Sequence, residues 1–343
     1  MRRARASIAL PVIGIVLIAA MVVATGFGAE NIPVRDVVGV LVHRLRGGVS
    51  ADLGLDTIVW QLRVPRTILA AIVGAGLAVA GAAMQTLVRN PLADPYLLGV
   101  SSGAGVGAAA VITSGLFAGA GLWALSAGAL AGALAAAAAV FLIAMAQGGL
   151  TPLRLVLTGT VLGSAFAAFS SYLIFRSSEP SAAQSVLFWL LGSLSGADWT
   201  RILFPASVVA ASLIALLLAA NWLDVLNVGP DTAASLGIPV RELRIALFIL
   251  LAVLVGVLVA VSGGIGFVGL VVPHAARLVV GPRHRALLPA SALCGAAFLV
   301  IADAATRVLV RPTEIPVGVL TGLIGAPAFL LLMGRRRYSF GAA

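Results

Sequence analysis

Two groups of residues in this chain have types and spacing that could do chemistry. The run Gly99-Val100-Ser101-Ser102-Gly103 matches the G-x-S-x-G pattern of a hydrolase nucleophile elbow. Such a serine needs a histidine as its base, and His274 is the residue an intramembrane serine protease would use. The elbow also needs a strand before the serine, whereas the flanks here are apolar runs of helical length. Because the strand is missing, proteolysis is an alternative function and not the main interpretation.

Asp303 and Arg307 form the second group, because a four-residue separation places them on the same face of a helix. A lone charge in hydrocarbon is costly, so we expect the two side chains to pair. A proton relay would need Asp, Glu and His residues in the other apolar runs, and the sequence shows no such chain. This disfavours an ion-coupled secondary transporter, the second alternative function. The sequence also lacks the G-x-x-x-x-G-K-[ST] phosphate loop, so an active transporter of this kind would take its energy from another subunit.

Composition places both groups in a membrane protein. Hydrophobic residues make up 61% of the 343 residues and charged residues 10%, against about 25% charged residues in a soluble domain. The net charge of +10 comes from arginines without any lysine, which we assign to loops at the membrane surface rather than to nucleic-acid binding. Cys294 is the only cysteine, so no internal disulfide is possible. We expect no cofactor and no metal site.

The apolar runs predict an all-α, polytopic membrane protein of about ten transmembrane helices, forming a single transmembrane domain over residues 1–343. Residues 28–62 are expected outside the membrane, and the arginine distribution favours a cytoplasmic location for both termini. A thirteen-residue apolar segment, 184–196, is too short to cross about 30 Å of hydrocarbon, so we expect a short helix within the outer half of the bundle. The predicted spans are 8–27, 64–86, 96–112, 120–146, 153–175, 201–221, 243–261, 264–280, 286–309 and 316–334.

Small residues recur at four-residue spacing, which lets membrane helices approach closely. The pairs are Gly128/Gly132, Gly159/Gly163 and Gly318/Gly322. We interpret all of them as packing positions.

The polar segment 220–244 contains a short helix with both ends marked. Pro230 suits the first helical position, Asp231 complements the positive helix start, and Gly237 can adopt the left-handed conformation that ends a helix. A helix from Pro230 to Leu236 is too short to be stable alone. It is either an ordinary connector between spans or a docking helix for a soluble subunit.

The sequence resembles the FecCD-type permeases, the membrane subunits of type II ABC importers for cobalamin, haem and iron–siderophore complexes. The resemblance extends over about residues 58–334, with its motifs in the family's order. It rests on Arg63-Val64-Pro65-Arg66-Thr67, Gly81-Ala82-Ala83-Met84-Gln85, Asn90-Pro91-Leu92-Ala93-Asp94-Pro95, Leu98 to Ala104, Gly266 to His274, and Glu314-Ile315-Pro316-Val317-Gly318 through Gly325-Ala326-Pro327.

The resemblance implies a homodimer of permeases in the bacterial cytoplasmic membrane, with two ABC ATPase subunits beneath and a substrate-binding protein outside. It implies no catalytic residue in this chain. The implied cargo is a metal chelate, iron–siderophore or haem first and cobalamin next.

The resemblance also assigns roles to particular residues. Binding-protein docking falls on Arg63, Arg66 and Arg307, and the inner gate on Asn90, Leu92, Thr151 and Pro152. The pathway lining falls on Ser164, Ser171, Tyr172, Phe175 and Arg176. ATPase coupling falls on Pro230, Asp231, Thr232, Ala233, Ala234, Ser235, Leu236 and Gly237, although the family often has a Gly-Glu pair where Gly229-Pro230-Asp231 stands here.

Overall fold

The computed structural model describes residues 2–48, 50 and 52–334, and within these residues the chain is helical and forms no β-strand. The predicted all-α class is confirmed. The helices are α1 (Arg2–Gly26), α2 (Val34–Leu45), α3 (Leu53–Asp56), α4 (Val64–Leu87), α5 (Val100–Ser114), α6 (Ala124–Ala146), α7 (Pro152–Arg176), α8 (Ala182–Leu190), α9 (Leu203–Leu218), α10 (Ala220–Val228), α11 (Pro230–Ser235), α12 (Val240–Ser262), α13 (Val268–Val280), α14 (His284–Thr306) and α15 (Val317–Gly334). Short 3-10 helices lie at Pro95–Leu98, Ala118–Trp123 and Trp199–Arg201.

Seven helical segments of the described chain are long and apolar enough to cross a membrane. Three shorter apolar helices, α5, α13 and α15, correspond to the other predicted spans. At 1.5 Å per residue, the 24 residues of α4 extend about 36 Å, whereas the 13 residues of α13 extend only about 20 Å. The segment before α13, residues 263–267, is buried or half-buried, as irregular backbone within a bilayer requires.

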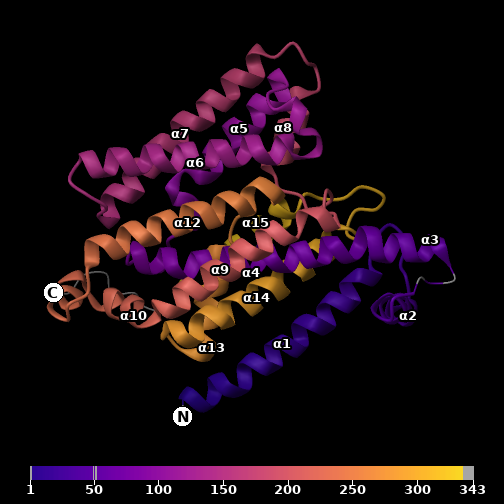
Figure 1. Cartoon of the computed structure of the whole chain (residues 1–343), viewed down its shortest axis with the longest axis horizontal. Coiled ribbons are helices and arrows are strands. Elements are labelled where there is room, and N and C mark those ends of the chain that lie inside the picture. The colour runs from indigo at the N-terminus through magenta and orange to yellow at the C-terminus, as the bar shows by residue number, and fades with distance from the viewer. Residues whose placement is uncertain (1, 49, 51, 335–343) are drawn as a thin grey trace.

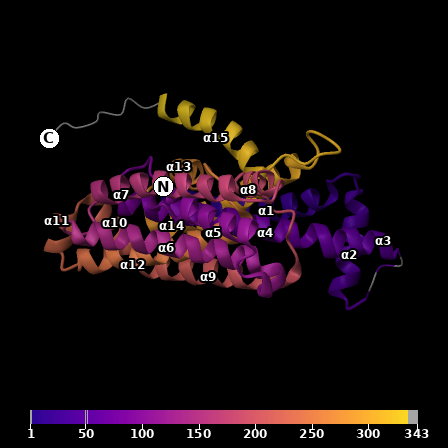
Figure 2. The ribbon, with the colours of Figure 1, turned by 90° about the horizontal axis from the view of Figure 1, so that it is seen from above.

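The long helices run roughly side by side, with α4 and α14 in the middle of the bundle (Figure 1). Helix α1 packs along α14, while α5, α6, α7 and α8 form a neighbouring group that contacts the centre through α12 (Figure 1). The short helices α10 and α11 lie at one end of the bundle and α2 and α3 at the other, and α15 leaves the bundle at an angle (Figure 2). The predicted cytoplasmic and external segments therefore occupy opposite ends.

Glycines bring the central helices into backbone contact. A Cβ atom added at Gly74 of α4 would lie 2.2 Å from the carbonyl oxygen of Gly295 in α14, a distance that side chains do not tolerate. The predicted packing positions Gly128 and Gly132 of α6 likewise face Gly107 and Gly103 of α5 at backbone distance. Of the other predicted pairs, Gly159 and Gly318 make such contacts, whereas Gly322 meets no atom within 4 Å.

The structure differs from the predicted boundaries most clearly in two places. Helix precedes Val64, because α3 and a π-helical segment, Thr57–Arg63, continue directly into α4; much of the segment predicted as external is therefore helical. The predicted span 201–221 ends at Leu218, and the polar stretch after it forms a separate helix, α10. The predicted short helix in 184–196 is confirmed as α8, with nine residues.

Candidate functional sites at the two ends of the bundle

The end of the bundle that carries α2 and α3 contains an ion-pair cluster between α4 and α14. Arg66 donates from Nε to both carboxylate oxygens of Asp303, at 3.0 and 3.1 Å, and from Nη2 to Asp303 Oδ1 at 2.9 Å. The Asp303 side chain is 1% exposed and that of Arg66 12%. In a medium of low polarity such a bidentate pair is held firmly, because separation would leave two unpaired charges.

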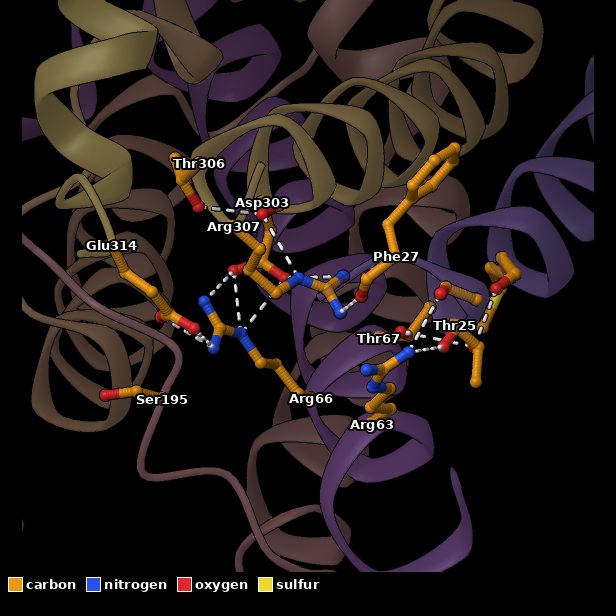
Figure 3. Close-up of polar contacts among 12 residues, drawn as sticks. Thr25, Phe27, Arg63, Arg66, Thr67, Ser195, Asp303, Thr306, Arg307 and Glu314 are labelled. Carbon is orange, nitrogen blue, oxygen red and sulfur yellow. Dashed lines mark hydrogen bonds and ion pairs between the residues drawn. The ribbon is translucent and has the colours of Figure 1, made fainter. Parts of the chain in front are cut away.

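Two further residues complete this cluster. Arg307 Nη2 lies 3.1 Å from Asp303 Oδ2, which confirms the predicted pair on α14, and Arg307 Nη1 donates to the carbonyl oxygen of Phe27 at 2.9 Å. Arg66 Nη1 donates to both oxygens of Glu314, at 3.1 and 2.8 Å. Figure 3 shows Arg66 pointing between the two carboxylates. Two arginines and two acidic residues thus balance one another, and Glu314, at 44%, is the most exposed of the four.

Arg63 lies one turn from Arg66 and is held by backbone rather than by carboxylates. Its guanidinium donates to the carbonyl oxygens of Thr25, Gly26 and Glu30 at 3.2, 2.8 and 2.6 Å (Figure 3). All three arginines predicted to dock a binding protein therefore already have intramolecular partners. Their docking role stays a prediction. The contacts of Arg66 could not be predicted from the sequence, because its partners lie more than 200 residues away along the chain.

A cleft of about 380 Å³ opens beside this cluster. Apolar side chains of α8 and of the segment entering α15 form much of its wall, and Ser193 and Ser195 contribute hydroxyls. The start of α15 is tied to the segment after α8, since Val317 N donates to the carbonyl oxygen of Gly192 and Gly318 N to that of Leu191. Arg66, Asp303 and Glu314 thus line a hollow between α8 and α15.

At the opposite end, α11 agrees with the predicted helix to within one residue. Its Ala233 is buried, whereas Leu236, just after the helix, is 66% exposed. Gly237 has φ +77°, the left-handed conformation predicted to end this helix. The apolar side chains of Trp222 and Val228, on the preceding helix α10, are also exposed. Within the described residues, α11 is therefore anchored by one alanine and flanked by the exposed apolar side chains of Val228 and Leu236.

The residues predicted for the inner gate stand at helix ends. The Asn90 side chain accepts a hydrogen bond from Leu92 N at 2.9 Å, which forms a tight turn after α4. Thr151 caps α7 by accepting from Arg154 N at 3.4 Å, and Pro152 follows as the first helical residue. These local roles explain the residue types without a gate, so the gate stays a prediction.

The predicted pathway residues lie on an exposed face of α7. Tyr172 and Phe175 are 52% and 88% exposed, and Arg176 ends the helix. The hydroxyls of Ser164 and Ser171 donate to carbonyl oxygens one turn earlier, at 3.1 and 3.0 Å. Because those bonds satisfy the hydroxyl protons, this face is compatible with a cavity wall, a second subunit or lipid.

A third polar group, near α11, was not anticipated from the sequence. His284, the first residue of α14, is buried; its Nδ1 lies 2.6 Å from Asp224 Oδ1 and its Nε2 2.8 Å from Thr86 Oγ1. Burial acts to raise the pKa of Asp224, but hydrogen bonds from the His284 side chain and backbone outweigh it and hold that pKa below its usual range. These three residues come from α10, α14 and α4.

Comparison with known proteins decides the family. A model described as the FecCD transport family matches residues 16–335. The chain belongs to the FecCD transport family. It is 43% identical over 283 residues to the hemin transport system permease protein HmuU of Yersinia pestis, which covers 81% of this chain and 84% of that protein. It is 38% identical over 356 residues to the cobalamin import system permease protein BtuC of Halobacterium salinarum, covering 94% of this chain and 95% of that protein.

A solved structure supports the same assignment at the level of fold. The FecCD-family chain superposes with a TM-score of 0.83 and 32% identity on a structure described as an inward-facing conformation of a metal-chelate type ABC transporter. The match covers 95% of this chain and 99% of that one. The FecCD-like bundle predicted from the sequence motifs is thereby confirmed.

These findings remove the two alternative functions. Membership in a family of permeases favours transport over proteolysis, and the G-x-S-x-G run is not a nucleophile elbow. Gly99, with φ +71°, joins the 3-10 helix Pro95–Leu98 to α5, so no strand precedes Ser101. The solved structure that the chain matches is described as an ABC transporter, not as an ion-coupled carrier.

Proposed function

We propose that this chain is the permease subunit of an ABC importer that moves a metal chelate across the bacterial cytoplasmic membrane. Two copies form the pathway, two ATPase subunits bind at the end that carries α11, and a substrate-binding protein docks at the end that carries the ion-pair cluster. Both termini lie in the cytoplasm. ATP hydrolysis belongs to the partner ATPase, and this chain contributes no catalytic residue.

This proposal rests mainly on how α11 is held and exposed in a chain of the FecCD family. A six-residue helix cannot be stable alone, yet here it is held between α10 and α12 with only Ala233 buried. The exposed side chains of Val228 and Leu236 flank it. A short helix held in place and flanked by exposed apolar side chains at the bundle's end suits a cleft in a soluble subunit, through which ATP-driven closure moves the spans.

The exposed apolar faces of α7 and α15 support a second copy of the chain as partner. Leu157 and Val161 of α7 are 55% and 67% exposed, and Leu323 and Leu330 of α15 are 69% and 68% exposed. Helix α15 diverges from the other helices, which leaves a face that a second subunit can cover (Figure 2). We therefore place α7, α8 and α15 around the central pathway of a homodimer.

For the cargo, we propose an iron–siderophore or haem, with cobalamin next. The relatives named for hemin and for cobalamin are both close in sequence, so the family alone does not separate these chelates. On the predicted wall, the Ser164 and Ser171 hydroxyls donate to their own helix. Such a wall binds weakly, which assigns cargo selection mostly to the binding protein.

The decisive experiment is co-purification from native membrane. The chain is purified from native membrane and co-purifying proteins are identified by mass spectrometry, with optical spectra of the complex. We expect an ABC ATPase and a solute-binding protein, and a haem Soret band, a cobalamin spectrum or a siderophore charge-transfer band that identifies the chelate. A chain that emerges alone, and whose α11 crosslinks to no ATPase, would contradict the proposal.

A further inference from the structure

Three side chains from three helices meet at the end of the bundle where α11 lies. The buried imidazole of His284 bridges Asp224 of α10, at 2.6 Å, and Thr86 of α4, at 2.8 Å. Thr86 Oγ1 also lies 3.2 Å from the carbonyl oxygen of Ala82 in its own helix. Both ring nitrogens of a buried histidine are therefore satisfied, as burial of a polar group requires.

Asp224 also provides the cap of a helix to which it does not belong. The backbone N–H of His284, the first residue of α14, donates to Asp224 Oδ1 at 2.9 Å. Arg283, at the position before the helix, makes no side-chain capping bond. A free helix N-terminus favours a carboxylate because its N–H groups are unpaired and carry partial positive charge. Asp224 of α10 thus binds the start of α14 through both the backbone N–H and the ring of His284.

Helix α10 leads directly into α11, the helix proposed to contact the ATPase. Only Gly229 separates the end of α10 from the start of α11, and Ala233 N donates back to the Gly229 carbonyl oxygen at 2.9 Å. Leu223 and Leu226 of α10 and Ala233 of α11 are buried. A displacement of α11 therefore shifts α10 and, with it, Asp224.

On the other side of this joint, α4 and α14 move together. They touch backbone to backbone at Gly74 and Gly295, and the Arg66–Asp303 pair fastens their far ends. Thr86 and His284 fasten the near ends. A pair of helices joined at both ends and in the middle behaves as one rigid element.

We infer that Asp224 and His284 are positioning residues that transmit movement of α11 to the α4–α14 pair, and so link ATP hydrolysis to opening of the pathway. This inference rests on the proposed function, since it assumes that α11 seats in an ATPase. It assigns a mechanical role to two residues outside the coupling helix itself. The movement passes through the hydrogen bonds that the backbone N–H and Nδ1 of His284 make with Asp224 Oδ1, and through the contact of His284 Nε2 with Thr86 Oγ1.

The test uses proteoliposomes that contain the chain, its ATPase and its binding protein. Radiolabelled hemin, cobalamin and a ferric siderophore are offered in turn, and the one taken up by the unaltered protein is used for the variants. Uptake per ATP hydrolysed is measured for Asp224→Ala and Asp224→Asn. We expect Asp224→Ala to lower this ratio about tenfold, within the usual range of coupling between sites, while ATP hydrolysis persists. Asp224→Asn keeps the accepting oxygen, so we expect it to restore much of the ratio.

Control variants distinguish a wrong inference from a variant that does not assemble and from a wrong proposed function. Asn221→Ala, an exposed change on α10, should leave the ratio unaltered. If Asp224→Ala fails to assemble, Thr86→Val removes one hydroxyl from the joint and should lower the ratio in the same direction. An unchanged ratio in these variants, or Asp224→Asn as impaired as Asp224→Ala, overturns the inference. Absence of ATP-dependent uptake by the unaltered protein would instead refute the proposed function.

Discussion

Arg66 and Asp303 are 237 residues apart in the chain, yet Arg66 Nη2 and Asp303 Oδ1 lie 2.9 Å apart at the end of the α4–α14 contact. Because Asp303 also pairs with Arg307, one buried carboxylate balances two guanidinium groups, and Glu314 supplies the missing negative charge. This arrangement makes the cluster sensitive above all to the loss of the buried Asp303 carboxylate.

Asp303→Asn should destabilise the chain. The neutral amide leaves the guanidinium groups of Arg66 and Arg307 without their buried counter-charge. Breaking a buried ion pair in this way lowers the free energy of unfolding by about 3–5 kcal/mol. The measurement is the thermal unfolding midpoint of the purified chain in detergent. Glu179→Gln, at an exposed carboxylate, is the matched control and should leave the midpoint in place. Equal midpoints for the two variants would show that the cluster contributes no stability.

Charge reversal at Arg63 or Arg66 should weaken association with the binding protein if these residues meet acidic side chains of that partner. The loss should be largest at low salt, because screening suppresses attraction between exposed charges. Surface plasmon resonance at two ionic strengths measures it. Unchanged affinity at low salt would rule out the docking assignment.

Glu314→Gln tests the same docking assignment by removing the carboxylate that pairs with Arg66. Glu314 now accepts from Arg66 Nη1, so it competes with any carboxylate that a partner offers to this arginine. Its removal should tighten binding-protein association, while leaving the buried Asp303 contact intact. The same resonance assay measures it, and weaker association of Glu314→Gln would show that Glu314 itself helps to hold the partner.

The sequence predicts the parts of this molecule that depend on local spacing. Asp303 and Arg307 share a helix face, and Gly237 ends α11, because both features arise within a few residues. The partners of Arg66 could not be found in this way. The pair Arg66–Glu314 depends on how α4 meets the segment before α15, which no periodicity encodes.

The same limit applies to the inner end. Asp224 lies in a stretch whose polar residues suggest a loop, and His284 reads as an isolated residue at the start of a span. Their contact is fixed by the packing of α10 against α14 and α4. The family resemblance implies a coupling role for α11. It does not predict that Asp224, just before α11, contacts His284, which is 60 residues further along the chain.

Thr151→Trp should abolish uptake while ATP hydrolysis persists, if this residue lies at the inner gate. The bulky ring would obstruct the passage, but it also removes the α7 cap, which is worth about 1 kcal/mol. Thr151→Ala is therefore the matched control, since it removes the cap without adding bulk. Uptake and hydrolysis are measured together in proteoliposomes. Loss of both activities in Thr151→Trp would indicate misfolding rather than a blocked gate.

Leu236→Asp should separate the chain from its ATPase without affecting its own fold. Leu236 is 66% exposed, so a carboxylate there costs the isolated chain little, whereas in an apolar cleft of a partner it would be buried without a counter-charge. Ala233→Asp is the informative contrast, because Ala233 is fully buried and the charge should destabilise the chain itself. Co-purification of the ATPase reports the first effect and the thermal midpoint of the chain alone the second. If Leu236→Asp retains the ATPase at wild-type yield, the apolar surface around α11 does not form the contact.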